Sequence, residues 1–198
     1  GESGTGGSCI YSSFVNILGG IITKAKGGNA TDTNSGDGGH GISSDEALTI
    51  QNGNIETAQG GTSTNGTGGS GIRSGDTLTI SNSATITNAT GGTSTNGTGG
   101  NGIYSRRELK IDGGAAITNA TGGASTDDTG GSGIRSGGSV KIWGGTITKA
   151  TGGSGKSGGD GIGSYGALTI SGSAKIETAQ GGDSTNGTGG SGISSGGI

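Results

Sequence analysis

The hydrophobic residues of the chain fall into short patches that recur about every 30 residues. Each repeat opens with Gly-Ile-x-Ser, continues with an apolar-x-apolar patch such as 78–80, and then carries an isoleucine and an alanine, such as Ile86 and Ala89. Apolar and polar residues alternate within a patch, so every second side chain points to one face, as in a β-strand. The pattern therefore predicts three short strands in each repeat. The opening motif begins at Gly41, Gly71, Gly102, Gly133, Gly161 and Gly192.

The order of the patches predicts an all-β fold, a parallel β-helix or β-solenoid. Gly, Asn, Asp and Ser bound every patch, and no window carries the apolar spacing of an amphipathic helix. One repeat cannot bury its apolar face alone, whereas stacked repeats bury a continuous core. We expect a single-stranded, right-handed solenoid of about six coils, with equivalent residues stacked about 4.8 Å apart.

The repeats assign residues 1–198 to a single β-helix domain. Residues 1–40 form a degenerate N-terminal coil, 41–191 form five regular coils, and 192–198 begin an incomplete coil. The segments 60–69, 91–100 and 181–190 are expected to project, either as compact arcs or as an extended edge. The serine of each opening motif shares the inward parity of its isoleucine, which predicts an internal row of hydroxyl groups: Ser44, Ser74, Ser105, Ser136 and Ser164.

The composition alone would suggest disorder, because 54 of the 198 residues are glycine and only 24% are hydrophobic. The regular register of the apolar residues changes this interpretation, since nearly all of them can enter one core. Collagen is excluded by the missing three-residue period and the absence of proline. No apolar run approaches the roughly 18 residues of a membrane span, and a net charge of −3 disfavours nucleic acid as a partner.

The repeat unit resembles a known group of glycine-rich sequences. Gly-Gly-x-Gly-Ile-x-Ser-x-x-x-Leu-Thr-Ile-x-Gly-Gly-x-Ile-x-x-Ala-x-Gly-Gly is similar to the β-helix repeats of bacterial surface and secreted adhesins and of carbohydrate-binding β-helix domains. The resemblance covers nearly the whole chain. It implies a protein of the cell surface or the extracellular space with a structural, adhesive or glycan-binding role.

The sequence offers little for catalysis, and we expect no enzyme activity, no catalytic residue and no cofactor. The sole histidine, His40, occupies a position that serine fills in three other coils, which indicates a surface variant rather than a general base. No metal site is predicted. Calcium at loop carboxylates, for example in Gly-Gly-Asp-Gly-Ile at 158–162, is the alternative.

Two outward rows of cationic and aromatic residues are the candidate ligand-binding surface. They comprise Arg73, Tyr104 and Arg135 from the opening motifs, and Lys110, Lys141 and Trp143 from the second patches. Stacked at coil spacing, such groups could hold an acidic polysaccharide through bidentate hydrogen bonds and ring stacking. The alternative is a solvated face whose charge is balanced by Asp76 and Glu108.

Asn-x-Thr sequons are candidate glycosylation sites on an outer face. Chance is the competing explanation, because Asn, Gly and Thr dominate the loops. The asparagines are Asn29, Asn65, Asn88, Asn96, Asn119 and Asn186.

The two ends of the solenoid are a candidate subunit interface, since an open β-helix exposes unpaired backbone there. End-to-end stacking would give a filament or stalk of this chain, which is our leading interpretation of its function. The alternative partners are flanking coils of a larger adhesin, and the alternative function is that of a glycan-binding adhesin domain. Cys9 is either a small buried residue or the site of an intermolecular disulfide. The proposed interface residues are Cys9, Ile10, Phe14, Val15, Ile193 and Ile198.

Overall fold

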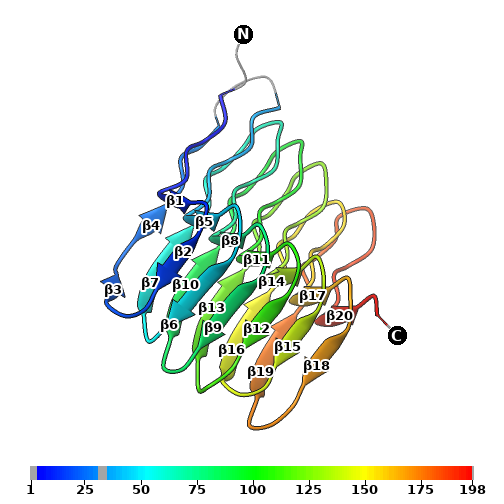
Figure 1. The fold of residues 1–198 in the computed structure, drawn as a ribbon. Coiled ribbons are helices and arrows are strands. Elements are labelled where there is room, and N and C mark those ends of the chain that lie inside the picture. Colours follow the sequence, from blue (N-terminus) through cyan, green and yellow to red (C-terminus); the bar gives the residue numbers. More distant parts are fainter. Residues whose placement is uncertain (1–3, 31–34, 198) are drawn as a thin grey trace.

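The apolar patches form strands, and the strands of successive repeats pair side by side in parallel (Figure 1). The computed structural model describes residues 4–30 and 35–197, so Ile198 lies outside the described residues. The described residues form no helix, and therefore none that could cross a membrane. The predicted β-solenoid is confirmed, and its coils follow one another along the stack from the blue to the red end of the chain in Figure 1.

Each regular coil contributes one strand to each of three parallel sheets, which we call A, B and C. The first coil contributes two short strands to sheet C, and the last strand of sheet A begins an incomplete coil. Sheet A contains β1 (Ile10–Ser12), β5 (Ile42–Ser44), β8 (Ile72–Ser74), β11 (Ile103–Ser105), β14 (Ile134–Ser136), β17 (Ile162–Ser164) and β20 (Ile193–Ser195). Sheet B contains β2 (Val15–Ile17), β6 (Leu48–Gln51), β9 (Leu78–Ser81), β12 (Leu109–Ile111), β15 (Val140–Ile142) and β18 (Leu168–Ile170). Sheet C contains β3 (Ile21–Ile22), β4 (Ala25–Lys26), β7 (Asn54–Gln59), β10 (Thr85–Thr90), β13 (Ala116–Thr121), β16 (Thr146–Thr151) and β19 (Lys175–Gln180).

Equivalent aliphatic side chains stack inside the three sheets, as the repeat predicts. Ile111 pairs with Ile80 on one side and with Ile142 on the other, and all three are 0% exposed. The isoleucine and the alanine of each inner sheet C strand, such as Ile86 and Ala89, are equally buried. A chain poor in hydrophobic residues thus obtains one continuous core, because almost every aliphatic side chain is used in it.

The predicted serine row is also confirmed, at the corner between sheets A and B. Ser74 Oγ donates to the carbonyl oxygens of Glu46 and Thr77 at 2.8 and 3.0 Å. Ser105 Oγ donates in the same way to Asp76 and Glu108, both at 2.7 Å. Each buried hydroxyl therefore bonds to carbonyl groups of the turn that joins the two sheets.

The glycine-rich segments between sheet C and sheet A project from the body as extended arms, the second of the two expected forms (Figure 1). We define the arms as residues 60–71, 91–102, 122–133, 152–161 and 181–192. Gly69 N donates to Gly61 O within one arm, and Gly61 N donates to Gly39 O of the preceding coil, both at 2.8 Å. We call this continuing series of bonds the glycine ladder.

The glycine ladder leaves no room for side chains. A Cβ atom at Gly61 would lie 1.9 Å from the carbonyl oxygen of Gly28. The arm 152–161 is the shortest, yet it keeps the ladder: Gly153 N donates to Gly131 O at 2.7 Å, and Gly159 N to Gly153 O at 2.9 Å. The abundance of glycine therefore reflects the close approach of neighbouring backbones.

Candidate ligand-binding groove

A groove runs along the stack where the returning halves of the arms meet the outer face of sheet A. It consists of two adjoining hollows of about 390 and 320 Å³ that share Thr67, Asn101, Arg135 and Tyr165. The first hollow also reaches His40, Arg73 and Tyr104. The groove thus spans several coils and is open along its length, a shape that suits a linear ligand.

Three of the predicted binding residues form one column in this groove. Tyr104 of β11 pairs with Arg73 of β8 and with Arg135 of β14, so their side chains leave successive coils about 4.8 Å apart. All three are half-buried. Ser43 belongs to the same column but is 1% exposed. Its neighbours in the column are Tyr11 and Arg73, whose longer side chains shield a small one.

Tyr165 is the groove residue that the sequence analysis missed. The Arg135 guanidinium carbon lies 4.5 Å from the centroid of the Tyr165 ring, and Arg135 Nη2 donates to the phenol oxygen. Tyr165 stands in the turn after Ser164, so strand parity does not place it in the column. Gly163 stands in the column beside Arg135 and has no side chain that could contact the guanidinium group. That glycine is the signal that could have pointed to the next large residue.

The residues before each Gly-Ile motif form the floor of the groove and alternate in type. Ser70 N donates to His40 Nδ1 at 2.8 Å, Ser132 N to Asn101 Oδ1 at 2.9 Å, and Ser191 N to Asp160 Oδ1 at 2.9 Å. Burial, and then the charge of Arg73, lower the pKa of His40 from 6.5 to about 4. The imidazole is therefore neutral near pH 7, as an Nδ1 acceptor must be.

The other three predicted residues lie on sheet B and not in the groove, so the six residues do not share one face. Lys110 Nζ lies 2.9 Å from Glu108 Oε2, and Lys141 Nζ forms an ion pair with Oε1 of the same carboxylate. These two ammonium groups lower the pKa of Glu108 to about 2. Lys141 also lies 5.6 Å from the Trp143 ring centroid. Both sheet B lysines thus have a carboxylate partner, Glu108.

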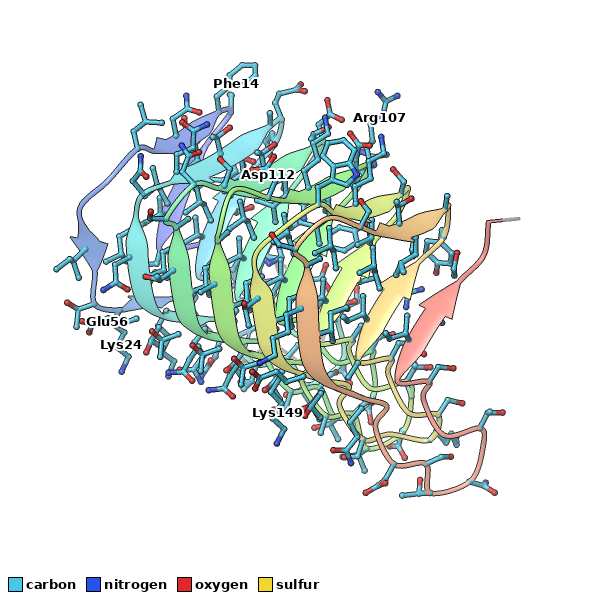
Figure 2. All side chains as sticks on the ribbon, turned by 90° about the horizontal axis from the view of Figure 1, so that it is seen from below. Phe14, Lys24, Glu56, Arg107, Asp112 and Lys149 are labelled. Carbon is cyan, nitrogen blue, oxygen red and sulfur yellow. The ribbon has the colours of Figure 1, made fainter. Side chains whose placement is uncertain are left out.

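The cations of sheet A differ in this respect. Within residues 4–30 and 35–197, no carboxylate forms an ion pair with Arg73 or Arg135. By contrast, Arg107 Nε, at the edge of the same sheet, lies 3.7 Å from Asp76 Oδ1. Figure 2 shows Glu56 and Lys149 on the far side of the solenoid from Arg107, along the outer face of sheet C. The groove therefore holds two guanidinium groups whose charge no carboxylate of the described residues neutralises, although Arg135 also donates from Nη1 to Ser132 Oγ at 3.3 Å.

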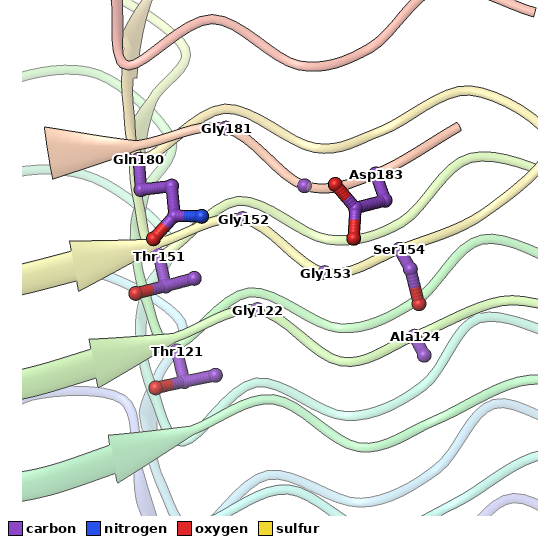
Figure 3. A pocket seen from close by; sticks show the side chains of 11 residues that line it. Thr121, Gly122, Ala124, Thr151, Gly152, Gly153, Ser154, Gln180, Gly181 and Asp183 are labelled. Atoms are coloured by element: carbon purple, nitrogen blue, oxygen red, sulfur yellow. The ribbon is translucent and has the colours of Figure 1, made fainter.

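A separate hollow of about 300 Å³, outside the groove, lies on the other side of the arms, next to sheet C (Figure 3). Its polar side chains are those of Thr121, Thr151, Ser154, Gln180 and Asp183, and glycine backbone forms much of the rest. Its lining includes neither a cationic nor an aromatic residue. The groove on sheet A is therefore the stronger candidate for a ligand.

No cluster of three or more His, Cys, Asp or Glu residues that could hold a metal ion occurs among the described residues. In the glycine–aspartate turn at 158–162, both carboxylate oxygens of Asp160 already accept hydrogen bonds. Oδ1 accepts from Ser191 N at 2.9 Å, and Oδ2 accepts from Ser194 Oγ at 2.6 Å. Asp160 therefore serves the backbone and side chains of the next coil.

The candidate glycosylation sites are distributed over three parts of the molecule, and their modification stays a prediction. Asn65, Asn96 and Asn186 lie on the arms. Asn88 and Asn119 lie on the outer face of sheet C, where Asn119 Nδ2 donates to Asn88 Oδ1 at 3.1 Å. Asn29 lies after β4 in the first coil, and its Oδ1 accepts from Thr62 N at 3.0 Å.

The candidate interface residues are exposed to different degrees. Cys9 is exposed and free, so the expectation of a buried cysteine is wrong. Phe14 is 63% exposed and Ile193 is 45% exposed, whereas Val15 is only 7% exposed and Ile10 is half-buried. Val15 enters the core because it pairs with Leu48 of β6.

Comparisons of the chain with protein-family models, with curated proteins and with solved structures found no match.

Proposed function

We propose that this β-solenoid is an extracellular glycan-binding protein whose groove holds a linear acidic polysaccharide. One observation carries the proposal. Arg73, Tyr104, Arg135 and Tyr165 line a single groove along successive coils, and neither guanidinium has a carboxylate partner among the described residues. The extracellular location rests on the resemblance of the repeats to those of surface and secreted proteins.

The chemistry of these side chains suits an acidic sugar polymer. A guanidinium group binds a carboxylate through two parallel N–H···O bonds, and it is always charged. A tyrosine ring offers an apolar face for the C–H groups of a sugar and a hydroxyl group at its rim. Since the groove is continuous, neighbouring sugars would meet neighbouring coils. Binding, and not catalysis, is the proposed activity, and in it His40 has a positioning role through its bond with Ser70.

Replacement of the two arginines tests the proposal. We expect Arg73→Gln and Arg135→Gln each to weaken binding of an acidic polysaccharide about tenfold, because each removes one charge-assisted contact. The measurement is isothermal titration calorimetry with a panel of acidic and neutral polysaccharides. Lys149→Gln is the matched control, since it removes the same charge from the exposed face of sheet C. Unchanged affinity in the double arginine variant would refute the proposal.

A structural role through end-to-end stacking is the second candidate, and the last coil supplies its specific observation. Ile170 and Ile193 are 43% and 45% exposed, whereas their equivalents Ile142 and Ile162 are 0% exposed. A second copy stacked on this coil would bury them and continue all three sheets. Long uniform fibres in electron micrographs of the purified chain are the expected result, and monodisperse particles would count against it.

A further inference from the structure

The groove repeats its chemistry every two coils, not every coil. The coils that carry Arg73 and Arg135 have a serine on the floor, Ser70 and Ser132. The coil between them carries Tyr104 and the acceptor side chain of Asn101. The side-chain types along the groove therefore repeat every second coil, although the backbone repeats every coil.

The two cations of the groove lie two coils apart, and its carboxylates lie beyond them. Among the described residues that line the groove, the cations come only from the coils of Arg73 and Arg135. The carboxylates that line the groove and its continuation, Asp37 and Asp160, belong to the two coils outside this pair. Going along the stack, a ligand would meet a carboxylate, a cation, a neutral coil, a second cation and a second carboxylate. An acidic group fits at two places that are two coils apart, about 9.5 Å.

We infer that the groove selects polysaccharides made of acidic disaccharides, in which a uronic acid alternates with an uncharged sugar. This inference rests on the proposed function. One sugar of an extended chain advances by about the height of one coil, so acids on every second sugar would reach Arg73 and Arg135 together. The uncharged sugar between them faces Tyr104 and Asn101.

A polymer with an acid on every sugar is disfavoured by the same arrangement. Its intermediate carboxylate would lie at the neutral coil, where Asn101 Oδ1 already accepts from Ser132 N and no cation compensates the charge. The next intermediate carboxylate would approach Asp160. Removing a charge from water without a compensating partner costs free energy, and two like charges repel each other.

The test compares three sets of hexasaccharides by calorimetry at one ionic strength. The first set is alternating, from hyaluronan and chondroitin; the second carries an acid on every sugar, from polygalacturonate and alginate; the third is neutral, from cellulose. We expect an alternating hexasaccharide to bind at least about tenfold more tightly than any member of the other sets. Equal or tighter binding of a fragment that carries an acid on every sugar would overturn the inference and leave the proposed function intact. Absence of binding by both acidic sets would overturn the proposed function as well.

A gain-of-charge variant provides the second arm of the test. Tyr104→Arg places cations on three successive coils, so we expect it to raise the affinity for an oligogalacturonate or oligoalginate about tenfold and to abolish the preference. Thr118→Arg adds the same charge at an exposed position of sheet C and is the matched control. Far-UV circular dichroism and thermal unfolding confirm that both variants are folded. If Tyr104→Arg leaves the preference unchanged, spacing of charge does not determine selectivity.

Discussion

The floor of the groove shows how much a single residue position contributes. The residue before a Gly-Ile motif accepts a hydrogen bond from the next coil where it is His40, Asn101 or Asp160. In each case the donor is the backbone N–H of the serine at the equivalent position of that coil. These side chains therefore join neighbouring coils from outside the core. Their chemical differences are compatible with one role, because each offers an acceptor atom to the same backbone N–H group.

The acceptor role of His40 predicts that stability depends on pH. The pKa of His40 is about 4 in the folded chain and near 6.5 when unfolded, so the unfolded state binds more protons between these values. Folding stability is therefore complete above about pH 6.5 and falls as the pH drops toward 4. We expect a loss of about 2 kcal/mol between pH 7 and pH 5, measured by urea denaturation.

His40→Asn is the matched variant for this experiment, because Asn101 fills the equivalent position. It should keep an acceptor for Ser70 N and lose the pH dependence in this range. The carboxyl of Glu108 does not interfere, since its pKa is lowered from 4.5 to about 2 and its contribution is lost only below about pH 4.5. An equal loss of stability in both proteins would rule out His40 as the cause.

At this scale the sequence was informative where a strand fixes the side-chain direction. Arg73, Tyr104 and Arg135 could be assigned to one column from parity alone, and they line one groove. Tyr165 could not, because a turn has no fixed period. The repeat placed Lys110 and Lys141 in the second strand of their coils, but it did not give the angle between the second sheet and the first. Their separation from the groove therefore could not be predicted.

Strands and arms are stabilised by different forces although they alternate along the same chain. The strands bury aliphatic side chains, and the arms align backbone groups with almost no side chains between them. The number of strands and their register followed from the repeat. The form of the arms did not, because a glycine-rich segment has no side-chain pattern and its bonds depend on neighbouring coils.

The glycine ladder predicts that glycine is required only where a neighbouring backbone lies close to it. A Cβ atom at Gly99 would lie 2.0 Å from Gly123 O, and backbone atoms cannot easily move away. We expect Gly99→Ala to destabilise the fold by about 2 kcal/mol or more. Gly189 occupies the same arm position in the last described coil, where the nearest atom to a Cβ, Gly182 O, is 3.9 Å away. Gly189→Ala should change the free energy of unfolding by less than about 0.5 kcal/mol in urea titrations. Equal effects would show that contact between coils is not the reason for glycine.

At the scale of the whole molecule, each inner coil supports two neighbours and each outer coil only one. The sequence predicted this arrangement well, because a repeat that must stack to bury its core leaves few alternatives. The outermost coils then present edges of all three sheets. Stacking of a second copy would give those edges partners of the same register.

The stacking model predicts that a charge on the end of the solenoid blocks assembly. Ile170→Lys changes a side chain that is already 43% exposed, so the single molecule should stay folded while fibres are lost. Trp143→Lys is the control. Trp143 is 47% exposed in a turn after β15, and its coil is an inner one that does not form the end of the solenoid. Sedimentation velocity and electron microscopy give the readout. Identical fibres from Ile170→Lys, or no fibres from the unmodified chain, would exclude stacking through this face.

The short arm at 152–161 has an implication for engineering. Its backbone hydrogen bonds to the adjacent arms are preserved although its outer part is shorter. The bonds near the base of an arm therefore do not depend on the length of its apex. Foreign peptides grafted at successive apices would be presented in single file, one per coil, at a pitch set by the backbone. The solenoid would thus serve as a scaffold that fixes the spacing of the grafted peptides while their sequences are changed.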